Sequence, residues 1–246
     1  MVSNEPLSPS YTLDRCEGQP RGVVLLIHNF GGSRHSLRFL ADFYLRRKFD
    51  VLRRDLSFHG SQKWKIQIPI RSRWIQECHE LGQVGRQINR GRLLGFHAQS
   101  AMCSELLSSI ICKNSSTKEV DFYILENGPY RSAKEAIDRI LKHHYKISPR
   151  PLRRLIGKMM QLGWGRDTDK VFSDHIRELS GGKFRPMLFI ASENDPIMLP
   201  SEISEIAKSI STSQIQILPA IGHLQGLKRR PDLFNKIIDD FLDSVG

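Results

Sequence analysis

The chain has 246 residues, of which 39% are hydrophobic and 8% aromatic, and it carries a formal net charge of +11. This length suits one domain with a single core, or a domain with a small insertion. No apolar run is long enough to span a membrane, and the first residues lack the charged start and apolar core of a signal peptide, so we expect a cytoplasmic protein.

The cysteines indicate the redox state of the protein, and its basic charge indicates which classes of partner to consider. The four cysteines show no C-x-x-C spacing and are expected to be reduced thiols: Cys16, Cys78, Cys103 and Cys112. The positive charge could serve an anionic substrate, a membrane surface or nucleic acid, although a solvated basic surface is the plainest interpretation. No nucleic-acid motif accompanies it. We therefore expect a small-molecule partner and no nucleic acid, with an anionic ligand, peripheral membrane contact and the oligomeric state left open.

Strand and helix patterns alternate along the chain. Apolar runs predict strands near 8–17, 23–28, 50–55, 92–95, 120–125, 186–192 and 214–218, and helical spacing predicts helices near 37–45, 70–90, 98–112, 201–210 and 231–245. This alternation predicts an α/β protein whose mostly parallel, twisted sheet is covered by helices on both faces.

Strand signals stop between residues 130 and 184. Helical patterns at 136–145, 150–162 and 168–179 predict a helical cap insertion in a core made of 1–129 and 185–246. The middle helix is amphipathic, so its basic side is expected in solvent and its apolar side packed. The basic side carries Arg150, Arg153, Arg154 and Lys158, and the apolar side carries Leu152, Leu155, Ile156 and Met159.

A sharp turn from strand to helix is indicated at Gly95-Phe96-His97-Ala98-Gln99. The pattern follows the G-x-S-x-G nucleophile elbow, with histidine at the nucleophile position and glutamine at the second glycine. On this interpretation Ser100 lies one turn into the following helix, packed, and is not a displaced nucleophile.

Three further stretches carry a resemblance: Leu26–Ser33, Asp55–Ser61, and the pair Asp195 and His223. With the elbow, and in this order, they resemble the α/β-hydrolase fold over residues 20–245. The resemblance implies Asp195 as the orienting acid, with Glu193 as the second choice, and His223 as the general base. It also implies oxyanion donors at the backbone N–H groups of Phe30 and Ala98.

These residues predict a hydrolase acting on a small ester, thioester or amide. His97 would be the nucleophile or would activate water, with His223 and Asp195 in support. The residues expected to contact substrate are Asn29, His59, Gln99 and Trp164. Neither a cofactor nor a metal is predicted.

Several alternatives stay open. The chain could be a non-catalytic, ligand-binding member of the fold, or a lyase or cyclase that needs no serine. A metal site built on His97 and His223 with His59 or His28 has no recognised ligand spacing. His97 could also be a substitution introduced into an ordinary serine hydrolase.

Overall fold

The computed structural model describes residues 10–62, 70–89, 91–112, 115–164, 174, 176–178 and 184–246. Within them, seven strands form one sheet in the order β1-β3-β2-β4-β5-β6-β7. β1 is antiparallel to β3, and the other neighbouring pairs are parallel. The strands are β1 (Tyr11–Asp14), β2 (Gly22–Ile27), β3 (Phe49–Arg54), β4 (Leu93–Gln99), β5 (Phe122–Glu126), β6 (Met187–Ser192) and β7 (Ser213–Leu218).

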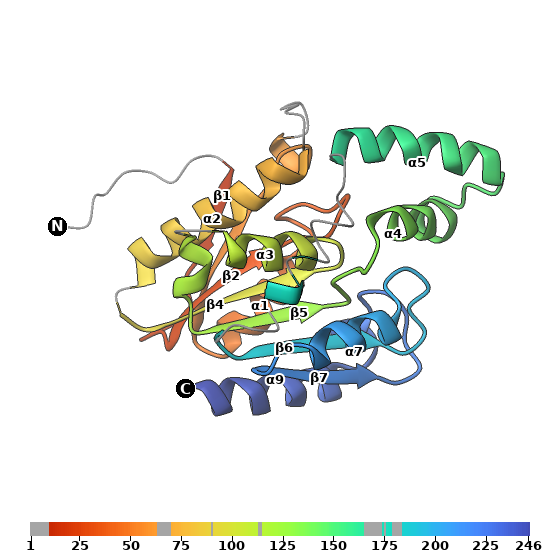
Figure 1. Cartoon of the computed structure of the whole chain (residues 1–246). Coiled ribbons are helices and arrows are strands. Elements are labelled where there is room, and N and C mark those ends of the chain that lie inside the picture. The colour runs from red at the N-terminus through yellow and green to blue at the C-terminus, as the bar shows by residue number, and fades with distance from the viewer. Residues whose placement is uncertain are drawn as a thin grey trace.

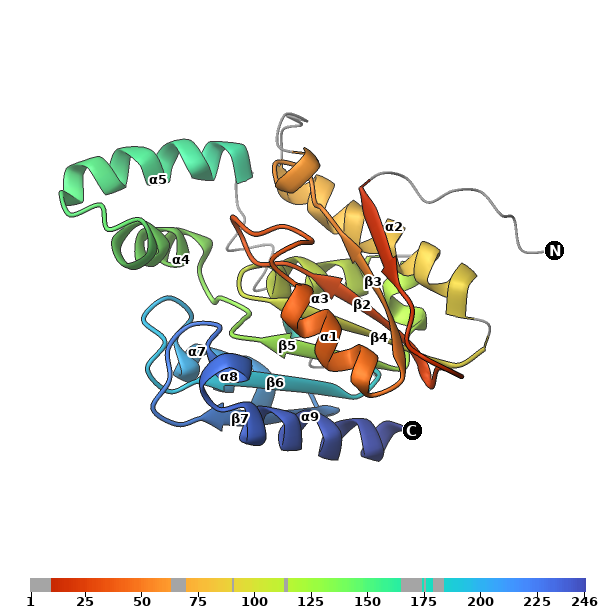
Figure 2. The ribbon, with the colours of Figure 1, turned by 180° about the vertical axis from the view of Figure 1, so that it is seen from behind.

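Helices cover both faces of this sheet, as predicted (Figures 1 and 2). One face is covered by α2 (Ile70–Asn89), α3 (Met102–Ile111) and α7 (Pro200–Lys208), and the other by α1 (Arg38–Arg46) and α9 (Pro231–Val245). Each face has its own cluster of buried apolar side chains. The short helix α8 (Gly226–Arg229) precedes α9, and the 3₁₀ turns η1 (Gly60–Gln62) and η2 (Ser116–Glu119) lie in loops.

The side chains of β4 alternate between the two faces, as those of a strand must. Phe96 and Ala98 belong to the apolar cluster beneath α2 and α3. His97 points the opposite way, toward α1, where its ring meets Tyr44. The strand therefore directs His97 into the interior and away from the edge of the sheet.

The turn from β4 into α3 comes later than the sequence pattern suggested. β4 continues through Gln99, and Ser100 has a left-handed backbone with φ +58° before α3 begins. The Ser100 N–H donates to the carbonyl of Glu126 at 2.8 Å, which joins the turn to the end of β5. A Cβ on Gly128 would lie 2.2 Å from the Ser100 carbonyl oxygen, so only glycine allows this close approach.

Between β5 and β6 the chain forms α4 (Ala133–Arg139), a π-helical turn η3 (Ile140–His144) and α5 (Arg150–Trp164). Both helices extend beyond the end of the sheet (Figure 1). The predicted helix at 168–179 falls mainly outside the described residues, and the division into a core and a cap at 130–184 stays a prediction.

The packing predicted for α5 is wrong in part. Ile156 is half-buried and packs against the main apolar cluster, but Leu152, Leu155 and Met159 are exposed. Met160, which the prediction did not include, packs beside Ile156. The helix therefore turns only a narrow apolar strip toward the protein and leaves a second strip in solvent.

Candidate active site

Ser100 and His223 meet at the carboxyl edge of the sheet. Ser100 occupies the turn after β4, and His223 lies in the loop after β7. The Oγ atom of Ser100 and Nε2 of His223 are 2.9 Å apart, a hydrogen-bond distance. A left-handed backbone is uncommon for a residue with a side chain and costs about 1–3 kcal/mol, so the surrounding structure must hold Ser100 there.

Asp195 lies behind His223, in the loop after β6. Its Oδ2 atom is 2.6 Å from Nδ1 of His223 and also accepts from the Asn127 amide at 2.9 Å. Its Oδ1 atom accepts from the backbone N–H groups of Ile197 and Met198 at 2.8 and 3.0 Å. With four donors around it, the buried carboxylate is held in one orientation and fixes the Nδ1–H tautomer of His223.

The ring of His223 thus faces two partners at once. Nδ1–H donates to the carboxylate, so Nε2 is left to accept from the Ser100 hydroxyl. The His223 side chain is 17% exposed, so solvent reaches its ring, whereas the Asp195 side chain is fully buried. A carboxylate, an imidazole and a hydroxyl in this order can remove a proton from the hydroxyl as it attacks.

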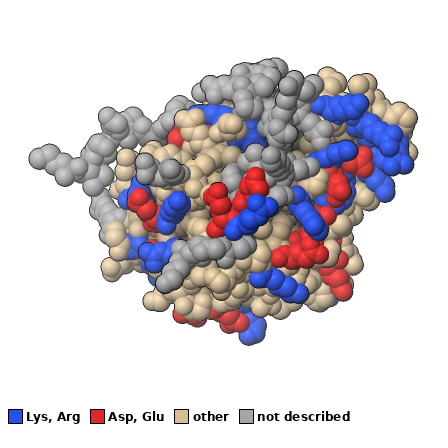
Figure 3. Space-filling view, in the orientation of Figure 1, with Lys and Arg blue, Asp and Glu red and all other residues tan. Residues whose placement is uncertain are grey.

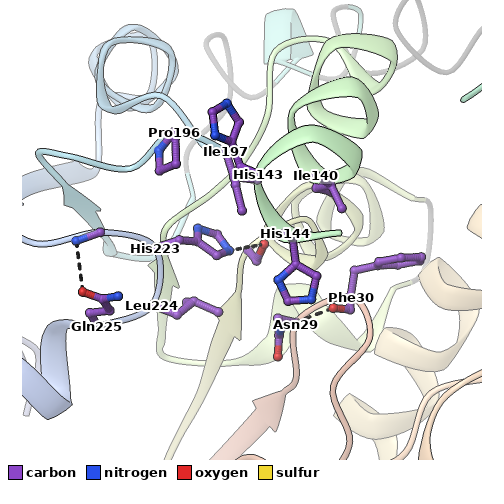
Figure 4. A pocket seen from close by; sticks show the side chains of 12 residues that line it. Asn29, Phe30, Ile140, His143, His144, Pro196, Ile197, His223, Leu224 and Gln225 are labelled. Atoms are coloured by element: carbon purple, nitrogen blue, oxygen red, sulfur yellow. Dashed lines mark hydrogen bonds between the residues drawn. The ribbon is translucent and has the colours of Figure 1, made fainter. Parts of the chain in front are cut away.

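A cavity of about 410 Å³ opens in front of Ser100 (Figure 4). His144 and Asn29 lie across it from His223, and Ile197 and Ile140 close its other side. Its lining is Asn29, Phe30, Ser100, Ile140, His143, His144, Pro196, Ile197, Gly222, His223, Leu224 and Gln225. The lining combines apolar side chains with six polar ones, and small-molecule sites likewise join apolar surface to polar groups that fix the ligand's orientation.

Two backbone segments border the hydroxyl. Ala101 follows Ser100 at the N-terminus of α3, where helix N–H groups point outward, and Phe30 lies in the loop after β2. His28 anchors that second loop: its Nδ1 is 2.9 Å from the Asn29 carbonyl, and its Nε2 accepts from the Leu56 N–H at 3.2 Å. Burial, and after it nearby His59, lower the pKa of His28 to about 4, so the ring stays neutral near pH 7.

The structure does not bring His97 to Asp195 and His223. Its ring is fully buried, with Nδ1 2.8 Å from the Tyr44 hydroxyl and Nε2 3.2 Å from Oε2 of Glu126. Burial, and after it the charge of Glu126, raise the pKa of Tyr44 well above its ordinary value, so the phenol keeps a proton to donate. The sharp turn from strand to helix predicted at His97 therefore lies at Ser100, because β4 is longer than the apolar run before Gly95 suggested.

That correction moves one of the predicted oxyanion donors. Ala98 lies inside β4, between Ile27 of β2 and Leu125 of β5, so its backbone belongs to the sheet. The residue after the turn is Ala101, at the N-terminus of α3. Phe30 lines the cavity beside Ser100, and its predicted role as an oxyanion donor stays a prediction.

The predicted substrate-contacting residues fall in different places. Asn29 lines the cavity, whereas Gln99 donates to Glu126 at 2.7 Å and lines a neighbouring pocket. His59 is buried behind Phe30, with Nδ1 3.0 Å from the Ser57 carbonyl. The Trp164 side chain lies outside the described residues.

Glu193, the second-choice acid, and the cysteines lie apart from the hydrogen bonds that join Ser100, His223 and Asp195. Glu193 accepts from the Ala220 N–H at 2.8 Å. Cys103 lies directly behind the turn, where its thiol donates to the Ala98 carbonyl, and burial raises its pKa well above the ordinary value. In the part of the chain that is described, all four cysteines are free, no helix is long and apolar enough to cross a membrane, and no three His, Cys, Asp or Glu side chains are grouped to hold a metal ion.

One signal in the sequence, the length of the strand, favours a turn at Ser100, and another feature hides it. The run Leu93–Gln99 has the length of an ordinary strand, whereas a strand that ended at Gly95 would be very short. The residue types at Ala98 and Met102 hide the turn, because both glycines of the usual pattern are absent around Ser100.

The seven-stranded sheet, with helices on both faces and the Ser100, Asp195 and His223 side chains at its carboxyl edge, defines the class. The chain has the α/β-hydrolase fold, which confirms the predicted fold class. No family model and no curated protein matches the sequence. The relation to known proteins therefore rests on solved structures.

Three of these structures illustrate the likeness. The esterase Pf2001 of Pyrococcus furiosus has a TM-score of 0.70 at 14% identity, over 92% of this chain and 82% of that one. Est1E of Butyrivibrio proteoclasticus, solved with ferulic acid, has a TM-score of 0.66 at 13% identity, over 96% and 94%. MenH of S. aureus has a TM-score of 0.61 at 15% identity, over 96% and 99%. At these identities the likeness shows the fold alone.

Proposed function

We propose that the chain is a serine hydrolase of small acyl compounds, with Ser100 as the nucleophile, His223 as the general base and Asp195 as the orienting acid. The observation that carries the proposal is the unbroken hydrogen-bonded series from Ser100 Oγ through His223 to Asp195, at 2.9 and 2.6 Å, centred on a left-handed Ser100. Such a series is recognised by its geometry and not by a sequence pattern.

The chemistry follows from the positions of these groups. His223 Nε2 takes the hydroxyl proton as Ser100 Oγ attacks the substrate carbonyl, and Asp195 stabilises the imidazolium that forms. The N–H groups of Ala101 and Phe30 would bind the oxyanion. His223 then protonates the leaving group, and a water molecule activated by His223 releases the acid from the acyl-Ser100 ester.

The cavity favours a compact substrate with an apolar part. Its volume of about 410 Å³ lies in the lower half of the range of small-molecule sites. Phe30, Ile140, Ile197 and Leu224 supply apolar contacts, and His143 and His144 of η3 also line the cavity. We propose a short-chain ester as the substrate class, which agrees with the names of the esterases among the similar structures.

A fluorophosphonate probe tests the assignment directly, because its phosphorus is attacked by an activated serine oxygen and fluoride leaves. We expect a covalent adduct on the peptide that contains Ser100, together with release of p-nitrophenol from short-chain esters. Both signals should disappear in Ser100→Ala and persist in His97→Gln, since His97 faces the opposite side of β4.

Two other outcomes would overturn the proposal. An adduct on any other residue, or ester turnover that survives Ser100→Ala, would move the nucleophile elsewhere. A folded protein that binds esters without labelling or turnover would support the alternative of a non-catalytic, ligand-binding member of the fold.

A further inference from the structure

Helix α5 carries a row of exposed apolar side chains. Leu152, Leu155 and Met159 are 46%, 59% and 65% exposed, although side chains of this kind are normally buried. Their spacing of three and four residues places them on one side of the helix, as a continuous strip. Because Ile156 and Met160 supply the packed side, the helix does not need this strip to hold its place in the fold.

A row of basic side chains runs beside the apolar strip. Arg150, Arg154 and Lys158 are four residues apart and exposed, and none forms an ion pair with a described residue. By contrast, Arg153 on the packed side is bound to Asp138 at 3.0 Å and to the carbonyl of Ser148 at 2.7 Å. Basic side chains gather where α5 lies, at the upper right of the space-filling view (Figure 3).

The acidic side chains close to this row are already engaged. Across the groove between the two helices, Asp138 of α4 is paired with Arg153, and Glu135 lies 3.9 Å from Arg139. Within α5 itself, residues 150–164 include four basic residues and no acidic ones. The positive charge of the exposed row is therefore left without a matching carboxylate on its own helix.

We propose that this face of α5, made of Leu152, Leu155, Met159, Arg150, Arg154 and Lys158, docks the protein on an anionic lipid surface. A helix in the membrane interface sinks its apolar side below the headgroups and keeps cations at the level of the lipid phosphates. Both requirements are met by the adjacent strips of α5. Nucleic acid would bind the basic row but leave the apolar strip uncovered. A second copy of the chain would bring two basic rows together, and these would repel each other.

The docking face is separate from the site around Ser100. None of its six residues lines the cavity in front of Ser100, which is lined in this region by η3. Lipid docking therefore does not rest on the proposed hydrolase activity. The Ser100→Ala variant should bind lipid as the parent does, so the two proposals can fail independently.

Cosedimentation with vesicles provides the test. We expect the full chain to bind vesicles of equal parts phosphatidylglycerol and phosphatidylcholine, to bind phosphatidylcholine alone weakly, and to be released by salt. Each cation near an anionic surface contributes about fivefold to partitioning, so Arg150→Gln/Arg154→Gln/Lys158→Gln should lower the partition coefficient about a hundredfold. Leu152→Ser/Leu155→Ser/Met159→Ser should lower it by a similar factor, because the apolar insertion is lost.

A matched variant elsewhere on the surface controls for general hydrophobicity. Phe39 and Ile217 are 80% and 49% exposed and lie away from α5, so Phe39→Ser/Ile217→Ser should leave vesicle binding unchanged. Equal binding by the Leu/Met triple variant would overturn the proposal, because attraction by charge alone would remain. The proposal would also be overturned if the parent self-associated and did not bind vesicles, and if the same three substitutions abolished that self-association.

Discussion

His97 and Ser100 are three residues apart in the chain but lie in two different regions of the molecule. His97 is in the interior between the sheet and α1, with both ring nitrogens occupied by Tyr44 and Glu126. Ser100 is at the edge of the sheet, where its hydroxyl meets His223 and a cavity. The comparison shows that a reactive residue type matters less than which end and face of a strand it occupies.

The largest expected effect separates the two regions by activity. Ser100→Ala should lower kcat/KM for a short-chain ester by a factor on the order of 10³ or more, since the attacking oxygen is lost. Adding His223→Ala to that variant should cost little more, because the two groups act as a unit. Steady-state kinetics on the purified, folded variants check this, and additive losses would contradict a shared proton transfer.

His97→Ala should act on stability instead. It leaves a void and removes the hydrogen bonds of the buried Tyr44 hydroxyl and Glu126 carboxylate, for a loss of about 2–4 kcal/mol in the free energy of unfolding. Urea denaturation measures the loss. The kcat/KM of the fraction that remains folded should stay within about tenfold of the parent. A fall in the kcat/KM of the folded protein of much more than tenfold would indicate that His97 takes part in the reaction.

Protonation of a third histidine, His28, should make the stability of the protein depend on pH. Burial, and after it nearby His59, lower the pKa of folded His28 to about 4, against about 6.5 for an ordinary histidine, so the unfolded chain binds the extra proton between these pH values. Stability should be complete above pH 6.5 and fall as the pH drops toward 4, by at most about 3 kcal/mol.

Urea denaturation at a series of pH values checks this prediction against His28→Gln. Glutamine can still accept from the Leu56 N–H but does not titrate, so its stability should change less over the same pH window. An identical pH dependence in both proteins would show that other groups are responsible.

The smallest expected effects come from alanine substitutions at two glycines, one in each region. A Cβ on Gly95, in the region of His97, would lie 2.2 Å from the Phe122 ring, and a Cβ on Gly128 would lie 2.2 Å from the Ser100 carbonyl oxygen. Each alanine substitution should cost about 1–3 kcal/mol of stability through overpacking.

Only Gly128→Ala should also lower kcat/KM of the folded protein, because it displaces the turn that holds Ser100. Thermal unfolding together with ester kinetics distinguishes the two variants. Equal activity per folded molecule in both would show that the position of Ser100 tolerates a shift of the turn.

Much of the molecule could be predicted from the order of its residues. Apolar runs and helical spacing act locally, so they located the strands of the sheet and most helices within a few residues. The resemblance to the α/β-hydrolase fold singled out Asp195 and His223, which follow the last two strands, and the structure places their side chains 2.6 Å apart. Strand ends of a parallel sheet share one edge, which makes such pairings predictable.

The tertiary structure alone decided where β4 ends and which strip of α5 is packed. The turn at Ser100 depends on the hydrogen bond to Glu126 and on the close approach of Gly128. Glu126 ends β5 and Gly128 lies in the loop after it, so both come later in the chain than the turn. The sequence shows that α5 is amphipathic, but the neighbours that cover Ile156 and leave Leu155 in solvent come from elsewhere in the fold. Local patterns carry no information about such contacts, because the residues that make them are brought together only by folding.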